Sequence, residues 1–173
     1  MKVLLIIDML NGFCRKGNPL SLPNTTVEIE KEIESRILIY TNNNYKYYFI
    51  CDSHSLNDPE INNPYPPHCM QGTDETKIIN TLSNYANKKN VLTKNTLSIT
   101  YNTKLIKKLE ELNPTQIEIT GVCTEICVMF AVYELRIRGY NVIVNSKGVL
   151  PLKSDNHEFF LTYIQELLGA IVF

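Results

Sequence analysis

The chain has 173 residues, 44% of them hydrophobic, and its 17 basic and 18 acidic residues leave a formal net charge of -1. This length and composition suit a single globular domain over residues 1–173 with a sizeable core. Because the charges are balanced, we expect neither a nucleic acid nor a membrane as a partner, and a small molecule as the ligand.

The cysteine count and the first residues bear on the compartment. Five cysteines are an odd number for a chain of this size, which suits a reducing compartment better than a disulfide framework. The apolar run within residues 1–8 is too short for a secretory signal and ends in an acid, and no later run approaches the length of a membrane span. We therefore expect a cytoplasmic protein.

Strand and helix patterns alternate along the whole chain. The first is an apolar run at residues 3–8, of the kind found in strands buried on both faces of a parallel sheet. Further strands are predicted at 45–52, 90–93, 116–120, 140–144 and 170–173. Helices are predicted at 26–40, 75–85, 102–112, 128–136 with Cys127 in its first turn, and 155–168, the last with Asp155 and Glu158 as a capping box.

This alternation predicts an α/β protein with three layers, αβα, in which a parallel sheet carries helices on both faces. In such folds, ligands bind beyond the carboxyl ends of the strands, near the point where the strand order reverses. Asp8, Asp52 and Lys94 each follow the end of a different strand. The turn at 121–127 follows a fourth strand, so we expect these groups to meet on one rim of the sheet.

The turn at 121–127 also carries a cysteine. With Thr124 as the N-cap, Cys127 falls at the third helical position, where free N–H groups and the helix dipole favour a thiolate. A carboxylate near a lysine, here Asp8 and Lys94, can take the thiol proton and return it to a leaving amine. The pattern predicts a nucleophilic Cys127; an inert buried cysteine and a structural Asp8–Lys94 ion pair are the alternatives.

A long irregular segment after the second strand carries two of the three histidines, and loops of this length are usually functional or disordered. Asp52 and His54 are separated by one residue, which places both side chains on one side of an extended segment. The loop adds Asp58, Glu60 and His68. A mixed set of His and carboxylate ligands suits Zn, Mn or Fe. We expect a site with three or four protein ligands and open positions; merely exposed histidines are the alternative.

Four stretches carry a family resemblance: DMLNGF at 8–13, DSH at 52–54, YPPHCMQGT at 65–73 and GVCTEICV at 121–128. On these stretches the chain resembles the isochorismatase-like cysteine hydrolases and, within them, is most similar to the nicotinamidases. The resemblance implies a six-stranded parallel sheet. It also implies a metal-dependent amidohydrolase of NAD salvage that converts nicotinamide to nicotinate and ammonia through a thioester, in a chain that can form homo-oligomers.

The resemblance further implies the roles of four residues in the reaction. Asp8, Lys94 and Cys127 form the catalytic triad. The backbone N–H groups of Cys123 and Cys127 form the oxyanion hole, and a cis peptide bond precedes Cys123. Cys123 stands where relatives more often have Ala or Ser, a change that matters little if only its backbone is used.

The resemblance also implies how the substrate ring and the metal are held. Phe13 and Tyr65 sandwich the ring, with ordinary core packing as their alternative role, and Tyr65 stands where many relatives have Trp. The cofactor is one divalent transition metal, with Zn favoured over Fe or Mn. Its ligands are Asp52, His54, Glu60 and His68. Glu60 occupies a position that is often His in relatives. Asp58 is the alternative ligand in place of Glu60.

Three other functions stay open as alternatives. Related amidohydrolases that act on another small amide or ureide share the triad but generally lack the metal loop, so Asp52, His54 and His68 discriminate between the two. A non-catalytic nucleotide-binding module is disfavoured because the turn at 8–12 has no G-x-G-x-x-G phosphate cradle. An isochorismatase proper cleaves a vinyl ether and does not need the nucleophilic cysteine.

Overall fold

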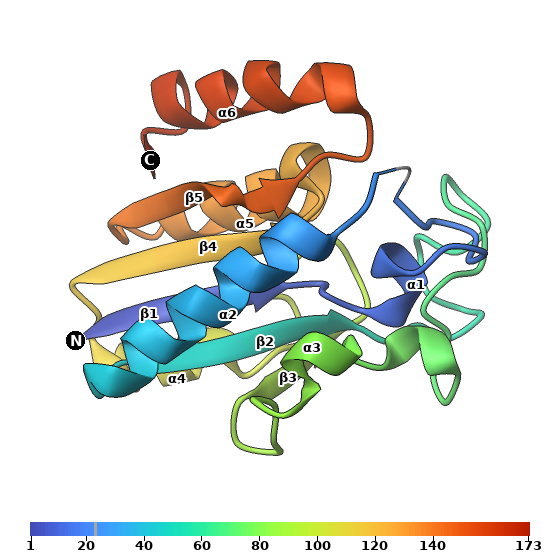
Figure 1. The fold of residues 1–173 in the computed structure, drawn as a ribbon, viewed down its shortest axis with the longest axis horizontal. Helices are drawn as coiled ribbons and strands as arrows, with labels where there is room; N and C mark the ends of the chain where they lie inside the picture. Colours follow the sequence, from blue (N-terminus) through green and yellow to red (C-terminus); the bar gives the residue numbers. More distant parts are fainter. Residues whose placement is uncertain (23) are drawn as a thin grey trace.

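A computed structural model describes residues 1–22 and 24–173; residue 23 lies outside the described residues. Within this part, six parallel strands form one sheet in the order β3-β2-β1-β4-β5-β6 (Figure 1). The strands are β1 (Lys2–Ile7), β2 (Lys46–Asp52), β3 (Val91–Lys94), β4 (Gln116–Val122), β5 (Val142–Leu150) and β6 (Ile171–Val172).

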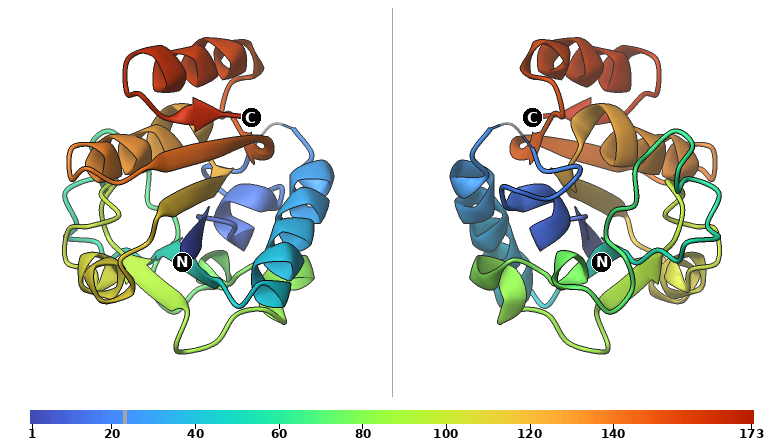
Figure 2. Two further views of the ribbon diagram at one scale, coloured as in Figure 1. Left: turned by 90° about the vertical axis from the view of Figure 1, so that its left-hand side faces the viewer. Right: turned by 90° about the vertical axis from the view of Figure 1, so that its right-hand side faces the viewer.

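Helices cover both faces of this sheet, which confirms the predicted αβα layers (Figure 2). One face carries α1 (Asn11–Cys14), α2 (Val27–Asn42) and α3 (Asn80–Ser83). The other face carries α4 (Leu105–Leu112), α5 (Met129–Arg136) and α6 (His157–Glu166). Short 3-10 turns lie at Asp74–Thr76 and Ser154–Asn156. No helix of the described residues combines the length and the apolar character that crossing a bilayer requires.

The first strand shows why its sequence is a continuous apolar run. Val3, Leu5 and Ile7 pack into the core beneath α4, α5 and α6, whereas Leu4 and Ile6 pack into the core beneath α1, α2 and α3. All five side chains are fully buried. Because successive side chains of a strand point to opposite faces, a strand covered on both faces has no solvated side.

The strand order reverses between β1 and β4, and the two strands approach each other closely there. Gly121 of β4 has a φ of 111°, and a Cβ at this position would lie 2.0 Å from the carbonyl oxygen of Ile7. Only glycine fits such a conformation and such a contact. The close approach brings the residues that follow β1 and β4 to one place, at the reversal point where α/β folds bind ligands.

Three details of the local structure differ from the sequence prediction. The helix predicted at 75–85 is interrupted, because backbone groups of Lys77 and Ile79 bond to the segment after β1 instead of continuing a helix. The capping box of Asp155 and Glu158 is wrong, since α6 begins at His157 and has no side-chain cap. The fifth strand continues well past its predicted end, through a polar irregular stretch, to Leu150.

Candidate active site

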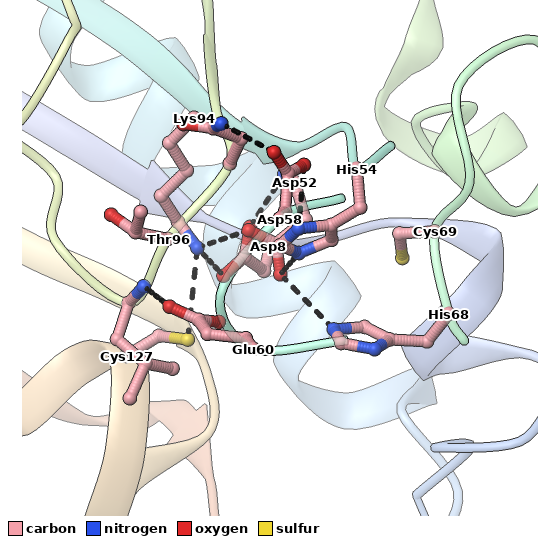
Figure 3. Close-up of polar contacts among 12 residues, drawn as sticks. Asp8, Asp52, His54, Asp58, Glu60, His68, Cys69, Lys94, Thr96 and Cys127 are labelled. Atoms are coloured by element: carbon pink, nitrogen blue, oxygen red, sulfur yellow. Dashed lines mark hydrogen bonds and ion pairs between the residues drawn. The ribbon is translucent and has the colours of Figure 1, made fainter. Parts of the chain in front are cut away.

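Three strand ends bring Asp8, Lys94 and Cys127 together, as the sequence predicted (Figure 3). Lys94 Nζ lies 2.9 Å from Asp8 Oδ2 and 3.8 Å from Cys127 Sγ. The same ammonium donates to Asp52 Oδ1 at 2.5 Å. The backbone N–H of Asp52 in turn donates to Asp8 Oδ1 at 3.0 Å. The four side chains are buried and form one connected polar cluster.

The charges in this cluster are set by burial and by Lys94. Burial raises the pKa of Asp8 to about 6, and the neighbouring Asp52 carboxylate adds to this effect while Lys94 opposes it. Burial acts to lower the pKa of Lys94, but the carboxylates of Asp52 and Asp8 outweigh burial and raise it. Lys94 is therefore a permanent ammonium, and Asp8 is a carboxyl group that can exchange a proton near neutral pH.

The nucleophile candidate Cys127 differs from the sequence expectation in its resting charge. Its predicted position at a helix start favoured a thiolate. Burial instead raises the pKa of Cys127 well above its usual value, although the charge of Lys94 acts to lower it. The resting thiol is thus neutral and needs a base to become nucleophilic. Asp8 is the candidate base, since its carboxyl group and the thiol both lie against the ammonium of Lys94.

The turn that carries Cys127 is a wide π turn, Thr124–Val128, in place of an ordinary helix start. Thr124 is not the N-cap: that position belongs to Cys123, whose carbonyl accepts bonds from the N–H groups of Ile126 and Val128 at 3.1 Å. The hydroxyl of Thr124 pairs instead with His157 Nδ1 at 3.2 Å. The peptide bond between Val122 and Cys123 is cis, as the family resemblance implies.

Asp52, His54 and His68 form a second cluster in which ligand atoms, one from each residue, lie within 4.8 Å of one another. All three side chains are buried. Within the described residues, both ring nitrogens of His54 are buried without a hydrogen-bond partner. Buried polar atoms normally have partners, so a histidine ring without one beside a carboxylate fits a metal ion bound to one of its two nitrogens.

The geometry of His68 supports the same interpretation. Its Nδ1 lies 2.8 Å from the carbonyl oxygen of Pro66, and its Nε2 lies 3.9 Å from Asp52 Oδ2. Metal-binding histidines usually donate their second N–H to a carbonyl or a carboxylate, which fixes the ring. Two histidines and one carboxylate are a common donor set for Zn, and imidazole also suits Fe.

Glu60 and Asp58, the other predicted ligands, bond to the segment after Lys94. Glu60 accepts a hydrogen bond from the N–H of Leu97, and burial raises the pKa of its carboxyl group. Asp58 accepts one from Asn95 at 2.9 Å and lies 3.5 Å from His54 Nδ1. Glu60 is not in the cluster of three, so its role as a fourth ligand stays a prediction.

A pocket opens over both clusters and encloses about 430 Å³ of space, including the part open to solvent. Phe13 and Tyr65 lie on its wall, and each ring centroid is 5.9 Å from that of His68. The remaining lining residues are Leu20, Asp52, His68, Leu97, Val122, Cys123, Ile126, Cys127 and Leu152.

Sequence reasoning missed the apolar residues of this wall. Leu20, Leu97 and Leu152 come from three different loops, and a leucine in a loop looks in sequence like any other satellite of the core. Only the position of Leu97, three residues after Lys94, offered a signal. These leucines make the part of the pocket wall that lies outside the two polar clusters apolar.

Comparisons with known proteins agree with this geometry. The isochorismatase domain model matches residues 2–172. The crystal structure of nicotinamidase PncA from Bacillus subtilis is 28% identical and covers 99% of this chain and 98% of its own, with a TM-score of 0.91. That of pyrazinamidase/nicotinamidase from Streptococcus mutans is 27% identical over the whole of both chains, with a TM-score of 0.91. Nicotinamidase 1 of Arabidopsis thaliana is 26% identical over 81% of this chain and 62% of its own.

Proposed function

The chain belongs to the isochorismatase family, and from this premise we propose that it is a metal-dependent cysteine amidohydrolase that converts nicotinamide to nicotinate and ammonia. The observation that carries this proposal is that one pocket is lined by Cys127, by Asp52 and His68 of the metal-ligand cluster, and by the aromatic residues Phe13 and Tyr65. An aromatic amide can therefore meet a nucleophile at one end and a metal-binding cluster at the other.

Asp8 and Cys127 carry the covalent steps. Asp8 takes the proton from Cys127, and the sulfur attacks the amide carbon. The backbone N–H groups of Cys123 and Cys127 stabilise the oxyanion of the tetrahedral intermediate. Asp8 then gives its proton to the leaving nitrogen, so that the C–N bond breaks, ammonia departs and a thioester remains. Water, deprotonated by Asp8, attacks the thioester, and nicotinate and the free thiol result.

Lys94 stabilises the negative charges that form during these proton transfers. Its ammonium contacts both Asp8 and Cys127, so it favours a charged carboxylate before the proton transfer and a charged sulfur after it. Because Lys94 is also bonded to Asp52, its position is fixed from two sides. Lys94 thus stabilises each anion in turn and need not itself lose a proton.

Asp52, His54 and His68 would hold one divalent transition metal, with Zn favoured and Glu60 as the predicted fourth protein ligand. When bound, such a metal supplies a Lewis-acid site for which the ring nitrogen of a pyridine is a good ligand. Phe13 and Tyr65 line the pocket beside His68 and would sandwich the ring. Together these groups orient the carboxamide toward Cys127.

A related amidohydrolase for a ureido acid is the main rival. Such a substrate carries a carboxylate, which requires a cation in the pocket. Among the described residues that line the pocket none is Lys or Arg, and the nearby charge of Lys94 is shared by Asp8 and Asp52. The described side chains of the pocket therefore leave an anionic ureide only the proposed metal as a counter-charge, the same metal that the proposal assigns to the ring nitrogen of nicotinamide.

The test is ammonia release from nicotinamide and from an N-carbamoyl amino acid, with the Cys127→Ala variant as the blank. We expect release from nicotinamide that depends on Cys127, and little from the ureido acid. Release from the ureido acid alone would transfer the assignment to the rival. Release from neither compound would remove the proposed substrate class altogether.

A further inference from the structure

Glu125 joins the nucleophile turn to a wall of the pocket. It lies on the π turn, two residues before Cys127, and its side chain is half-buried. Its Oε2 accepts the backbone N–H of Leu152 at 3.0 Å, and its Oε1 accepts that of Lys153, also at 3.0 Å. One carboxylate thus holds two successive peptide groups of the loop between β5 and α6.

That loop, residues 151–156, places Leu152 on the pocket wall. Ile126, the neighbour of Glu125, lines the same pocket. Leu20 comes from another loop, and a bond of 2.9 Å from Asn24 to Ser154 joins the two loops at the surface. The apolar wall is therefore built from separate loop segments, which depend on such bonds for their relative positions.

The carboxylate is well suited to hold this wall. Hydrogen bonds to an ionised acceptor are stronger than those between neutral groups, and two parallel bonds fix direction as well as distance. A Glu in the first turn of a helix also interacts favourably with the helix dipole, which is a purely structural role. The dipole does not require the bonds to Leu152 and Lys153, so these bonds point to a second role.

We propose that Glu125 is a positioning residue that fixes Leu152 against the substrate ring and thereby limits which ring substituents the pocket accepts. The inference rests on the proposed function, because it assumes an aromatic amide in this pocket. Glu125 touches no reacting atom in this account. It acts through Leu152, so removing either side chain should open the same part of the pocket.

The first test is a double-mutant cycle with Glu125→Ala, Leu152→Ala and the double variant. The measured quantity is the ratio of kcat/KM for nicotinamides carrying one extra methyl or phenyl group on the ring to kcat/KM for nicotinamide itself. We expect each single variant to raise this ratio for at least one bulky amide by roughly tenfold or more, the scale on which apolar pockets discriminate. The double variant should gain no more than the larger single effect, because the two residues act as one unit.

The matched control is Glu158→Ala, which removes an exposed carboxylate from the adjoining helix α6. It should leave the ratio unchanged. Gains in the two single variants that multiply in the double variant would overturn the proposal. So would a Glu125→Ala variant that loses the same factor with every amide, since a structural fault lowers all rates together.

A second test does not depend on turnover. Hydrogen exchange at the amides of Leu152 and Lys153 should be faster in Glu125→Ala than in Glu158→Ala, by roughly an order of magnitude. Unchanged exchange would refute the positioning role whatever the substrate. If exchange speeds up but the wild-type protein releases no ammonia from nicotinamide, the contact stands and the proposed function fails.

Discussion

At the level of single side chains, Lys94 connects the two halves of the proposed site. Its ammonium contacts Asp8 and Cys127 on one side and Asp52, a candidate metal ligand, on the other. Its side chain is fully buried, and buried ammonium groups need partners. Loss of Lys94 would leave two buried carboxylates without a counter-charge, so nucleophile and metal cluster are electrostatically linked.

Cys127 and Cys123 give the first prediction, because both residues line the pocket but only the thiol of Cys127 is proposed to react. Cys127→Ala should abolish ammonia release while its circular dichroism spectrum stays that of the wild type. Cys123→Ala is the matched control and should stay active, since the mechanism uses only the backbone N–H of this residue. Activity in Cys127→Ala, or loss of activity in Cys123→Ala alone, would show that Cys127 is not the nucleophile.

Asp8 gives the second prediction. Its φ of 52° lies in the left-handed region, where Asn is one of the few residues found readily, so Asp8→Asn can keep the backbone as it is. The variant has no base for the thiol proton, and the rate should fall by roughly 10²–10⁴. Steady-state kcat for nicotinamide at neutral pH measures this fall. A near-normal kcat would mean that another group removes the proton.

The histidines give the third prediction. Purified wild-type protein should contain about one transition metal ion per chain, and His54→Ala or His68→Ala should lose it, since each removes a ligand from a set of three or four. Elemental analysis by mass spectrometry provides the measurement. His157→Ala is the control, because this histidine bonds to Thr124 away from the cluster, and it should retain the metal. Full metal content in His54→Ala would contradict the assigned site.

Among the helices and strands, a buried ion pair fixes α2 on the sheet. Glu118 of β4 is fully buried and accepts bonds from Arg36 Nε at 2.7 Å and Nη2 at 2.6 Å, both from α2. The hydroxyl of Tyr40, also on α2, donates to the same carboxylate at 2.9 Å. This contact holds one helical layer in register with the strand that leads to the nucleophile turn.

Arg36→Ala should therefore destabilise the fold by about 3–5 kcal/mol, because it leaves a buried carboxylate without its counter-charge. Lys31→Ala is the control on the same helix: it removes a solvent-exposed pair with Glu28 and should cost about 0.5 kcal/mol or less. Urea unfolding of both variants gives the two free energies. Equal values would show that the buried pair contributes no more than a surface pair.

The same elements show which parts of the structure were predictable. Asp8, Asp52 and Lys94 were predicted to meet because each ends an apolar strand, and parallel strands share one functional edge. The prediction of one continuous helix at 75–85 was wrong: the apolar spacing fits a helix, but pairing with the segment after β1, including the bridge of Leu10 to Ile78, interrupts it before α3. Long-range pairing of this kind leaves no local sequence signal.

The walls of the site were the least predictable part. Leu97 and Leu152 lie in loops far apart in sequence, and each is positioned by a carboxylate that bonds to its backbone N–H, Glu60 and Glu125 respectively. Such bonds join a side chain to a peptide group that any residue could supply. Sequence patterns therefore identify the groups that do chemistry more readily than the surfaces that select a substrate.

Across the molecule as a whole, the sheet order places the candidate metal ligand Asp52 and the candidate nucleophile Cys127 on either side of Asp8. β2 and β3 supply Asp52 and Lys94, β4 leads to Cys127, and β1, which ends before Asp8, lies between them. The pocket spans this reversal point. In the proposed binding mode, a flat ring lying across this point would face the metal cluster with one edge and the thiol with its carboxamide, so the account predicts selection by the ring nitrogen.

The measurement that tests this central claim most directly compares nicotinamide with benzamide, which has the same shape but no ring nitrogen. The metal-loaded protein should prefer nicotinamide in kcat/KM by roughly 100-fold or more, the scale of rate loss when a substrate is misplaced. Removal of the metal by a chelator should abolish most of this preference, and added Zn should restore it. If metal-free protein hydrolyses both amides equally well and as fast as the loaded protein, the ring nitrogen plays no part and the enzyme is a generic amidohydrolase.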